Sequence, residues 1–336
     1  MLKKIQIHNF KSLRSPEIQT APLNILAGLN SSGKSSVMQA LHMAEQLMTG
    51  HSIDSMGHVD DLRCRYAQDK NKYGIVLYNH DGATREVRFD ASPCNVASFW
   101  KQFHFISADR LGPRVSFYSP KGANPVSVGE HGENVVACFK HYERDICNDS
   151  RLHVDADGET VEDNVNAWMR EICPGISVEW GLYGEIDAAH YMLRNRKDKN
   201  NKERPTNVGY GIAYALPIIV QLLCAVRESV VCVENPEAHL HPRGQTQLGA
   251  LMAKTAQSGI QIFVETHSDH FIDGVRIAVK EGWLAPEDVR VLYFSKSEDN
   301  ISTIQTLTID STGEMSDWPE GFCDQSLKNL SRLARF

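Results

Sequence analysis

Hydrophobic and polar positions follow a clear pattern in the first fifty residues. Apolar residues alternate with polar ones over residues 5–10, which predicts a strand, and a second apolar run at Leu23–Leu26 leads directly into Gly28. From Ser35 to Met48 the apolar positions recur at close to helical spacing, and Gly50 marks the end of that segment. The chain is therefore expected to begin with two strands, a glycine-containing loop and a helix.

The pattern is weaker between residues 51 and 200. Short β-like runs occupy residues 73–79, 86–89 and 103–107, and an amphipathic helix is predicted for Val161–Ile172. No heptad run or internal repeat is present, so a long coiled coil is not expected.

The pattern becomes strong again after residue 206. A polar, glycine-containing turn precedes an apolar helix at 212–227, with Pro217 placed near its first turns, where a proline is best tolerated. Two short apolar strands, 230–233 and 260–264, each end in charged or polar residues, as parallel strands do where they present a site. Residues 291–309 predict a closing hairpin. This alternation of strands and helices predicts an α/β fold.

The first loop carries the most specific motif of the chain. Residues 28–35, GLNSSGKS, match the phosphate-loop pattern G-x-x-x-x-G-K-[ST] between a strand and a helix. The glycines let backbone N–H groups point inward around the β- and γ-phosphates of ATP, and the helix N-terminus adds positive potential. Lys34 can reach the same phosphates, and the Ser35 hydroxyl can ligate Mg²⁺. The predicted ATP contacts are Gly28, Asn30, Ser31, Ser32, Gly33, Lys34, Ser35 and Ser36.

Two later strand ends carry further candidate chemistry. Glu234 ends the strand that begins at Val230, and a carboxylate at this position holds Mg²⁺ through water in phosphate-loop ATPases. His239 and His241 follow, but with no third ligand evident we favour a structural turn over a metal site. After the next strand, His267 is placed to touch the γ-phosphate and to sense hydrolysis.

Composition and charge narrow the class of protein. Lys plus Arg is 35 and Asp plus Glu is 42, which gives a formal net charge of −7. This charge excludes a nucleic-acid coat protein but leaves room for a local basic groove. The longest apolar stretch is shorter than the roughly 20 residues of a membrane helix, and the irregularly spaced cysteines indicate reduced thiols. We therefore expect a soluble, cytoplasmic protein with no membrane partner.

A charged run at 194–204 has two interpretations. It is either a solvated surface loop or a contact for double-stranded DNA or a protein partner. The candidate contacts are Arg194, Arg196, Lys197, Lys199, Lys202 and Arg204.

Four segments together resemble the ATPase heads of the ABC superfamily, in the RecF/SMC/OLD branch. The opening IQIHNFKSL…LNILAGLNSSGKSSVMQAL resembles the start of that branch, VCVENPEAHLHP its Walker B and D-loop region, VETHSDHF its switch-histidine segment, and NVGYGIAYALPII a degenerate signature motif. The resemblance implies a phosphate-loop NTPase with a mixed or parallel central sheet, an antiparallel β-subdomain and a helical lobe. It implies an ATPase domain at 1–309 with an insertion or lobe at about 51–205, and a short C-terminal tail at 310–336.

The resemblance also implies a head-to-tail homodimer, with room for a higher oligomer. Each ATP would lie between the phosphate loop of one chain and the signature turn of the other, whose contacts would be Asn207, Gly209 and Gly211. In the family's Q-loop region, at 105–114, no glutamine is present. Arg110 or Arg114 could contact phosphate there, or either could pair with surface carboxylates.

One departure from the family concerns the catalytic base. The family's catalytic carboxylate normally follows the Walker B acid directly, and this chain has Asn235 there. An amide can orient a water molecule but cannot take its proton. Either Glu237 supplies the base or hydrolysis is slow, and we favour slow but real hydrolysis.

These expectations give a leading function and one alternative. The leading function is an ATPase, using ATP and Mg²⁺, whose dimer gates or drives a DNA-directed or anti-phage defence effector. The alternative is a slow or inactive ATPase that restrains a toxin or nuclease partner until it is triggered. A self-sufficient nuclease is disfavoured, because a tail of 27 residues leaves no space for a nuclease domain. A separate effector protein is therefore expected.

Overall fold

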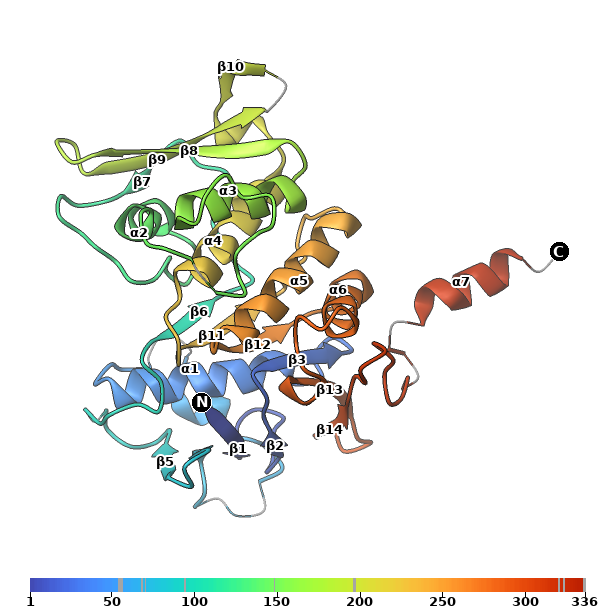
Figure 1. Ribbon diagram of the computed structural model, residues 1–336. Helices are drawn as coiled ribbons and strands as arrows, with labels where there is room; N and C mark the ends of the chain where they lie inside the picture. The colour runs from blue at the N-terminus through green and yellow to red at the C-terminus, as the bar shows by residue number, and fades with distance from the viewer. Residues whose placement is uncertain are drawn as a thin grey trace.

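A six-stranded mixed sheet forms the centre of the computed structural model, which describes residues 1–53, 57–67, 69, 71–93, 95–147, 149–195, 198–319, 321–322 and 324–334. The strand order is β14-β13-β3-β12-β11-β6 (Figure 1). In that order the strands span Ser302–Leu307, Val289–Lys296, Leu23–Gly28, Gln261–Glu265, Val230–Glu234 and Phe103–Ile106. Neighbours are parallel except β13 and β14, which are antiparallel. The predicted α/β fold with a mixed central sheet is confirmed.

Side chains of the central strands alternate between two hydrophobic cores, one on each face of the sheet. Ile25 of β3 and Val231 of β11 lie in one core, whereas their neighbours Leu26 and Cys232 lie in the other. Successive residues of a strand point to opposite faces, so a sheet covered on both sides produces unbroken apolar runs in the sequence. This explains why these strands were predictable.

One face of the central sheet is covered by α1 (Lys34–Met48) and by a second, antiparallel sheet. The strand order of this sheet is β2-β1-β4-β5. Its strands span, in that order, Glu17–Gln19, Leu2–His8, Gly74–Asn79 and Thr84–Arg88. Helix α1 and the N-terminal strands share this core, which places the start of α1 next to the end of β3.

The core on the other face of the sheet continues into a lobe of helices (Figure 1). Five helices contribute to this core. They are α2 (Val135–Tyr142), α3 (Val161–Ile172), α4 (Tyr210–Cys224), α5 (Pro242–Gln257) and α6 (Asp269–Lys280). Of these, α5 and α6 join the lobe to the central sheet. Helices α5 and α6 approach closely because a glycine of each helix lies against the backbone of the other. A Cβ on Gly249 would lie 2.3 Å from the Phe271 carbonyl oxygen, and one on Gly274 would lie 2.1 Å from that of Thr246.

A third sheet packs over α2 and α3 and forms the far end of the helical lobe (Figure 1). Its path is β10-β9-β7, and β8 pairs with β9. The strands β7 to β10 span Phe117–Tyr118, Ile176–Tyr183, Ala188–Asn195 and Asp198–Glu203. The described part of the chain also contains the 3₁₀ turns η2 (Val59–Leu62), η3 (Pro205–Asn207) and η4 (Pro286–Asp288).

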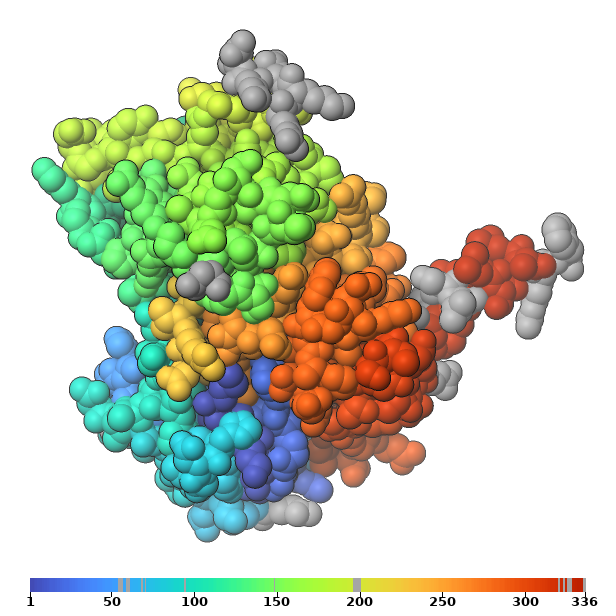
Figure 2. Space-filling view, in the orientation of Figure 1, coloured from blue at the N-terminus to red at the C-terminus, as the bar shows by residue number. Residues whose placement is uncertain are grey.

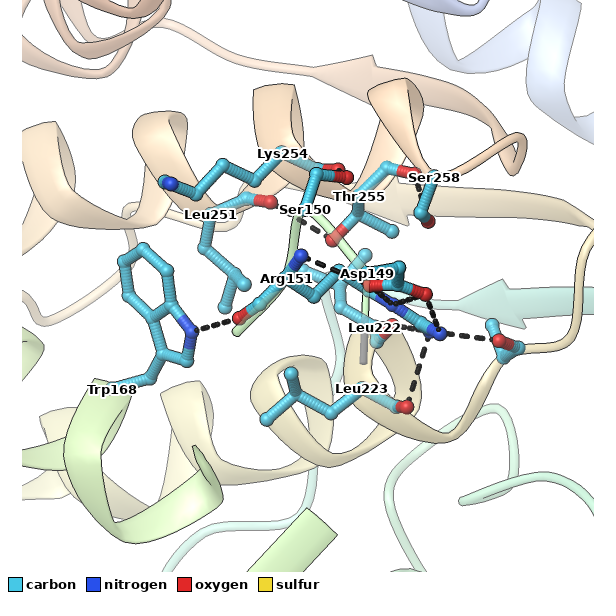
Figure 3. A network of polar contacts seen from close by, with 11 residues as sticks. Asp149, Ser150, Arg151, Trp168, Leu222, Leu223, Leu251, Lys254, Thr255 and Ser258 are labelled. Carbon is cyan, nitrogen blue, oxygen red and sulfur yellow. Dashed lines mark hydrogen bonds and ion pairs between the residues drawn. The ribbon is translucent and has the colours of Figure 1, made fainter. Parts of the chain in front are cut away.

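Arg151 and its neighbour Ser150 together connect three helices of the lobe (Figure 3). The Arg151 guanidinium donates to the carbonyl oxygens of Leu222, Leu223 and Ala225 at 3.0, 3.1 and 2.8 Å, so it satisfies carbonyls at the end of α4. The Trp168 indole of α3 donates to the Arg151 carbonyl oxygen at 2.9 Å. The neighbouring Ser150 hydroxyl donates to the carbonyl oxygen of Lys254 in α5.

The first part of the C-terminal tail packs back onto the core. Met315 is 8% exposed and Phe322 is 3% exposed, and the Phe322 ring lies edge-on to Tyr293 of β13. Helix α7 (Gln325–Leu333) then extends away from the body of the molecule (Figures 1 and 2). The tail is thus in two parts, one packed and one projecting.

One element differs from its prediction. Helix α4 begins at Tyr210 and ends at Cys224, so Pro217 lies in the helix interior and not in its first turns. The prediction placed the start two residues late and the end at Arg227. Pro217 is buried, and its ring lies against Gly132, where an added Cβ would lie 2.7 Å from it, so tertiary packing supports the proline at this position.

None of the helices in the described part of the chain is both long and apolar enough to cross a membrane.

Candidate nucleotide-binding site

The phosphate loop connects β3 to α1, as predicted. Gly28 ends β3 with φ +134°, and Gly33 precedes α1 with φ +105°. A Cβ on Gly28 would lie 2.1 Å from the Phe294 carbonyl oxygen, and one on Gly33 would lie 2.3 Å from the Ser302 hydroxyl oxygen. Both glycines are therefore required by backbone conformation and by the closeness of β13 and β14.

The loop borders a cavity of about 380 Å³. The residues lining it are Lys11, Ser12, Ser31, Ser32, Gly33, Lys34, Ser35, Ser36, Gln39 and Glu265. The N-terminus of α1 faces this space and carries no acidic residue in its first turn. An open helix end with serine hydroxyls and a lysine suits a phosphate chain.

Lys34 is almost completely buried, with 3% of its side chain exposed. Its ammonium donates to the carbonyl oxygens of Gly28 and Leu29 at 3.1 and 2.8 Å, and its Nζ lies 3.7 Å from Oε1 of Glu265. Burial lowers the pKa of Lys34, and the neighbouring carboxylates of Glu265 and Glu237 oppose that shift. The lysine is held by groups that phosphate oxygens can replace.

Two carboxylates end adjacent strands beside the loop. Glu234 of β11 and Glu265 of β12 are register partners, and both side chains are buried. Oε2 of Glu234 accepts a hydrogen bond from the Ala108 N–H at 3.0 Å. The other oxygen of Glu234, Oε1, is buried without a partner, and so is Oε2 of Glu265. Burial raises the pKa of Glu234, and the charge of Glu265 raises it further.

These unpaired oxygens match the requirements of a hydrated cation. Mg²⁺ prefers oxygen ligands and keeps several waters, and a buried acceptor without a partner is costly unless one is supplied. The Ser35 hydroxyl and the Glu234 carboxylate are therefore the residues that would hold Mg²⁺, directly and through water respectively. The ion would supply charge stabilisation for the phosphates.

Residues that directly follow β11 and β12 are joined by hydrogen bonds. The Asn235 N–H donates to the Glu265 carbonyl oxygen at 2.9 Å. The Glu237 carboxylate accepts from the Thr266 hydroxyl at 2.9 Å and from the His267 N–H at 2.8 Å. Burial raises the pKa of Glu237. The side chain predicted as a candidate base thus has both oxygens engaged in holding the segment that carries His267.

His267 itself is exposed and lies beside the loop. It lines a second cavity of about 250 Å³ together with Gly28, Asn30 and Phe322. Burial of part of the ring and the charge of Lys34 lower its pKa. His267 thus lies beside the phosphate loop, and Glu234 ends the strand next to the one that ends in Glu265.

Arg110 was predicted either to contact phosphate or to pair with surface carboxylates, and the second alternative is wrong. Its side chain is 2% exposed, and its guanidinium donates to the carbonyl oxygens of Ser107, Glu234 and Asn235 at 2.8, 2.7 and 2.7 Å. Burial lowers its pKa to about 10. Arg110 fixes the chain where β11 ends, which shapes the site, whereas Arg114 is exposed.

The signature segment is not at the phosphate loop of the same chain. Asn207 and Gly209 are exposed, and η3 packs on β9 in the helical lobe. The described lining of the phosphate-loop cavity includes none of the residues 207–211. Gly209 is the N-cap of α4 without a side-chain cap, and Gly211 lies against the His239 carbonyl oxygen.

The two histidines after β11 have structural contacts. The His241 side chain accepts from the Arg243 N–H at the start of α5. The His239 ring lies edge-on to Tyr214, with centroids 4.7 Å apart. Among the described residues, no group of three or more His, Cys, Asp or Glu side chains is arranged to hold a metal ion.

The charged run at 194–204 had two interpretations, a solvated surface loop or a contact for DNA or a protein partner; the loop is wrong for its described part, and the contact stays a prediction. Asn195 ends β9 and Asp198 begins β10, so the run forms two paired strands. Arg194 pairs with Glu179, and Lys202 Nζ lies 2.5 Å from Oε2 of the same residue. Arg196 and Lys197 lie outside the described residues, and so does the side chain of Lys199.

Three family models match parts of the chain. One described as "AAA ATPase domain" matches residues 1–106, and one described as "AAA domain, putative AbiEii toxin, Type IV TA system" matches residues 181–273. A third, described as "Protein of unknown function (DUF3696)", matches residues 284–333. A search among curated proteins found no match.

Solved structures of Smc heads share the fold. A Smc head bound to the C-winged helix domain of ScpA aligns with a TM-score of 0.56 and 15% identity, over 91% of this chain and 97% of that one. The Smc head with an extended coiled coil bound to the C-terminal domain of ScpA, from Pyrococcus furiosus, aligns with a TM-score of 0.55 and 12% identity, over 99% of each chain. Parts of the chain thus resemble AAA ATPase domains at 1–106 and 181–273, and the whole chain shares the fold of the Smc ATPase heads.

Proposed function

We propose that this protein binds and hydrolyses ATP and that ATP joins two copies head to tail. The observation that carries the proposal is the separation of two complementary phosphate-binding features. Lys34, Ser35 and the end of α1 face one cavity, whereas the open N-terminus of α4 lies in the helical lobe. Since a chain cannot fold its own α4 over its own phosphate loop, a second copy must supply that half.

The start of α4 is suited to this role. Gly209 is exposed, and a Cβ added to it would meet nothing within 4 Å, so its surroundings are open. The N-terminal N–H groups of a helix and its dipole attract anions. Asn207 and Gly211 flank this point, and we infer that the three residues contact the γ-phosphate bound to the partner copy.

A slow ATPase that acts as a scaffold is the second candidate, and Asn235 favours it. The Asn235 amide stands where the family has its catalytic carboxylate, and it cannot accept the proton of the attacking water. In this case ATP would hold the dimer closed for long periods. A separate nuclease or toxin would then be restrained or released by the state of the dimer.

The cellular role that we propose is defence against phage through such an effector. The model that matches residues 181–273 carries the name of an AbiEii toxin of a toxin–antitoxin system, which supports this context. Double-stranded DNA is a further proposed partner, and the described candidates for it are Arg194, Lys202 and Arg204. Arg204 is exposed, whereas the other two share Glu179.

The test measures mass and nucleotide binding together. Light scattering after gel filtration with ATP and Mg²⁺ should show a dimer of the wild type, and Lys34→Ala should show neither ATP binding nor dimer formation. Gly209→Asp places a negative charge at the proposed γ-phosphate contact, so we expect ATP binding without a dimer. Gly184→Asp, in the connection between β8 and β9, is the matched control and should dimerise normally.

Each result decides one part of the proposal. A wild type that binds ATP but stays monomeric contradicts the dimer, and failure to bind ATP contradicts the whole proposal. Phosphate release then separates the two candidates. Turnover on the order of 1 s⁻¹ or faster lies in the usual enzyme range and favours the ATPase, whereas a dimer that retains ATP for hours favours the scaffold.

A further inference from the structure

Glu265 is a buried carboxylate that faces the phosphate-loop cavity and that the sequence motifs leave without a role. It ends β12, which lies between β3 with its phosphate loop and β11 with Glu234. Only 6% of the residue is exposed, yet it lines the cavity together with Lys34 and Ser35. Among the described residues lining that cavity, it supplies the one carboxylate.

The two oxygens of Glu265 differ in their surroundings. Oε1 lies 3.7 Å from the Lys34 ammonium. Oε2 is buried and has no hydrogen-bond partner. A buried carboxylate oxygen with unfilled acceptor capacity is unfavourable unless a donor, such as a water molecule, occupies the space beside it.

The other acidic groups of the site are less available to a water molecule in this cavity. Both oxygens of Glu237 accept hydrogen bonds from the segment that carries His267. One oxygen of Glu234 accepts from Ala108, and neither Glu234 nor Glu237 lines the phosphate-loop cavity. Asn235 has no basic oxygen to offer.

We propose that Glu265 is a catalytic residue that accepts the proton of the water attacking ATP. The proposal rests on the ATP hydrolysis proposed above. The water oxygen forms a bond to the γ-phosphorus, and the bond from that phosphorus to the bridging oxygen breaks, so that ADP leaves with the electron pair. The proton passes from water to Glu265 and then to solvent, and the products are ADP and phosphate.

Lys34 and Asn235 hold Glu265 at the edge of this cavity. The Lys34 ammonium lies 3.7 Å from Oε1 of Glu265. The Glu265 backbone carbonyl accepts from the Asn235 N–H, which holds the amide and the carboxylate on adjacent strand ends.

The experiment compares Glu265→Gln, Glu265→Asp and wild type in the full-length protein, with Glu281→Gln on the exposed end of α6 as control. Single-turnover hydrolysis, binding of a fluorescent ATP analogue and the nucleotide retained after gel filtration are measured for each. General-base catalysis is worth roughly 10² to 10⁴-fold, so Glu265→Gln should lower the rate by about that factor. Its affinity for the analogue should stay within about threefold, and the variant should retain ATP where wild type retains ADP.

Two outcomes overturn the role, and one supports it further. Normal turnover by Glu265→Gln excludes a base at this position. Loss of nucleotide affinity to the level of Lys34→Ala shows that Glu265 serves as the structural counter-ion of the lysine. Glu265→Asp keeps a carboxylate on a shorter side chain, so partial recovery of turnover, with the pH dependence of the wild type, supports the base. If the wild type itself does not hydrolyse ATP, the result contradicts the proposed ATPase function. The failure then does not depend on which residue was chosen as the base.

Discussion

Gly28 combines an unusual backbone angle with an unusually close neighbour. Its φ of +134° is one that side chains disfavour, and the position of a Cβ lies 2.1 Å from the Phe294 carbonyl oxygen of β13. Gly82 shares a positive φ, +82°, but a Cβ there would meet nothing within 4 Å. The two glycines therefore separate the effect of backbone strain from the effect of a clash.

We predict that Gly28→Ala destabilises the protein considerably more than Gly82→Ala. The strain of a positive φ costs about 1–2 kcal/mol at either position, and overpacking at Gly28 adds about 1–3 kcal/mol because β13 or the loop must shift. Urea unfolding of both variants measures the difference. Equal losses would mean that the loop moves away from β13 without cost.

The residues of the site differ in how far the sequence reveals them. Gly28 to Ser35 are contiguous, so one motif predicts their shared role. Glu265 was not assigned, and the contacts of Arg110 with the end of β11 were not foreseen, because both depend on which strands are neighbours. Strand order is a property of the whole sheet and cannot be read from one segment. The sequence signal that could have pointed to Glu265 is that an apolar strand ends in this glutamate, as the strand before it ends in Glu234.

At the scale of the elements, Arg151 fixes the end of α4 through its side chain, and its backbone carbonyl oxygen accepts from Trp168 of α3. Its guanidinium is partly buried and donates to three carbonyls at the end of α4, and it also pairs with Asp149 at 2.7 Å (Figure 3). A planar guanidinium can satisfy several acceptors at once, whereas a lysine ammonium is a point charge.

We predict that Arg151→Lys lowers the free energy of unfolding by about 2–4 kcal/mol, because a hydrogen bond to a charged group contributes about 1.5–3 kcal/mol and more than one is lost. Arg243→Lys is the matched control, because Arg243 is exposed and its pair with Glu171 contributes about 0–1 kcal/mol. Chemical unfolding followed by tryptophan fluorescence would report both. A loss no greater than that of the control would show that the end of α4 is satisfied by water.

The elements themselves were predictable where burial alone determines the pattern. The strands β3, β11 and β12 are covered on both faces and appear as short apolar runs. The strands β7 and β10 could not be recognised, because β7 has two residues and β10 is rich in charged side chains, and both depend on pairing with β9. The prediction placed Pro217 near the start of α4 because prolines disfavour helix interiors, and it did not consider that packing can support a proline there.

At the scale of the whole molecule, the tail after β14 belongs partly to the core. We predict that a chain ending at residue 309 unfolds at a much lower temperature than one ending at 324, because removal of Met315 and Phe322 uncovers the core beside Tyr293. Burial of one such side chain contributes about 1.5–3 kcal/mol. Removing α7 alone should leave thermal unfolding nearly unchanged, and similar melting temperatures for both truncations would contradict this division.

The charge of −7 confines any contact with DNA to a local part of the surface, and the β9–β10 pair at the end of the lobe is our proposed location (Figure 1). Lys202 is half exposed beside Glu179, and Arg204 is exposed. We predict that Lys202→Glu with Arg204→Glu weakens binding to duplex DNA. The slope of log affinity against log salt should fall by about 1.8, because each lost phosphate contact contributes about 0.9.

A second double variant tests whether this effect is local. Lys101→Glu with Lys280→Glu makes the same change in net charge at exposed positions elsewhere, so it should leave both the affinity and the salt slope close to wild type. Fluorescence anisotropy of a labelled duplex over a series of salt concentrations measures both quantities. Equal losses in the two double variants would indicate general repulsion, and binding by wild type that does not depend on salt would exclude a phosphate contact. A loss confined to the first variant would place the duplex on the lobe that also carries the start of α4, where a DNA contact can influence whether two copies close around ATP.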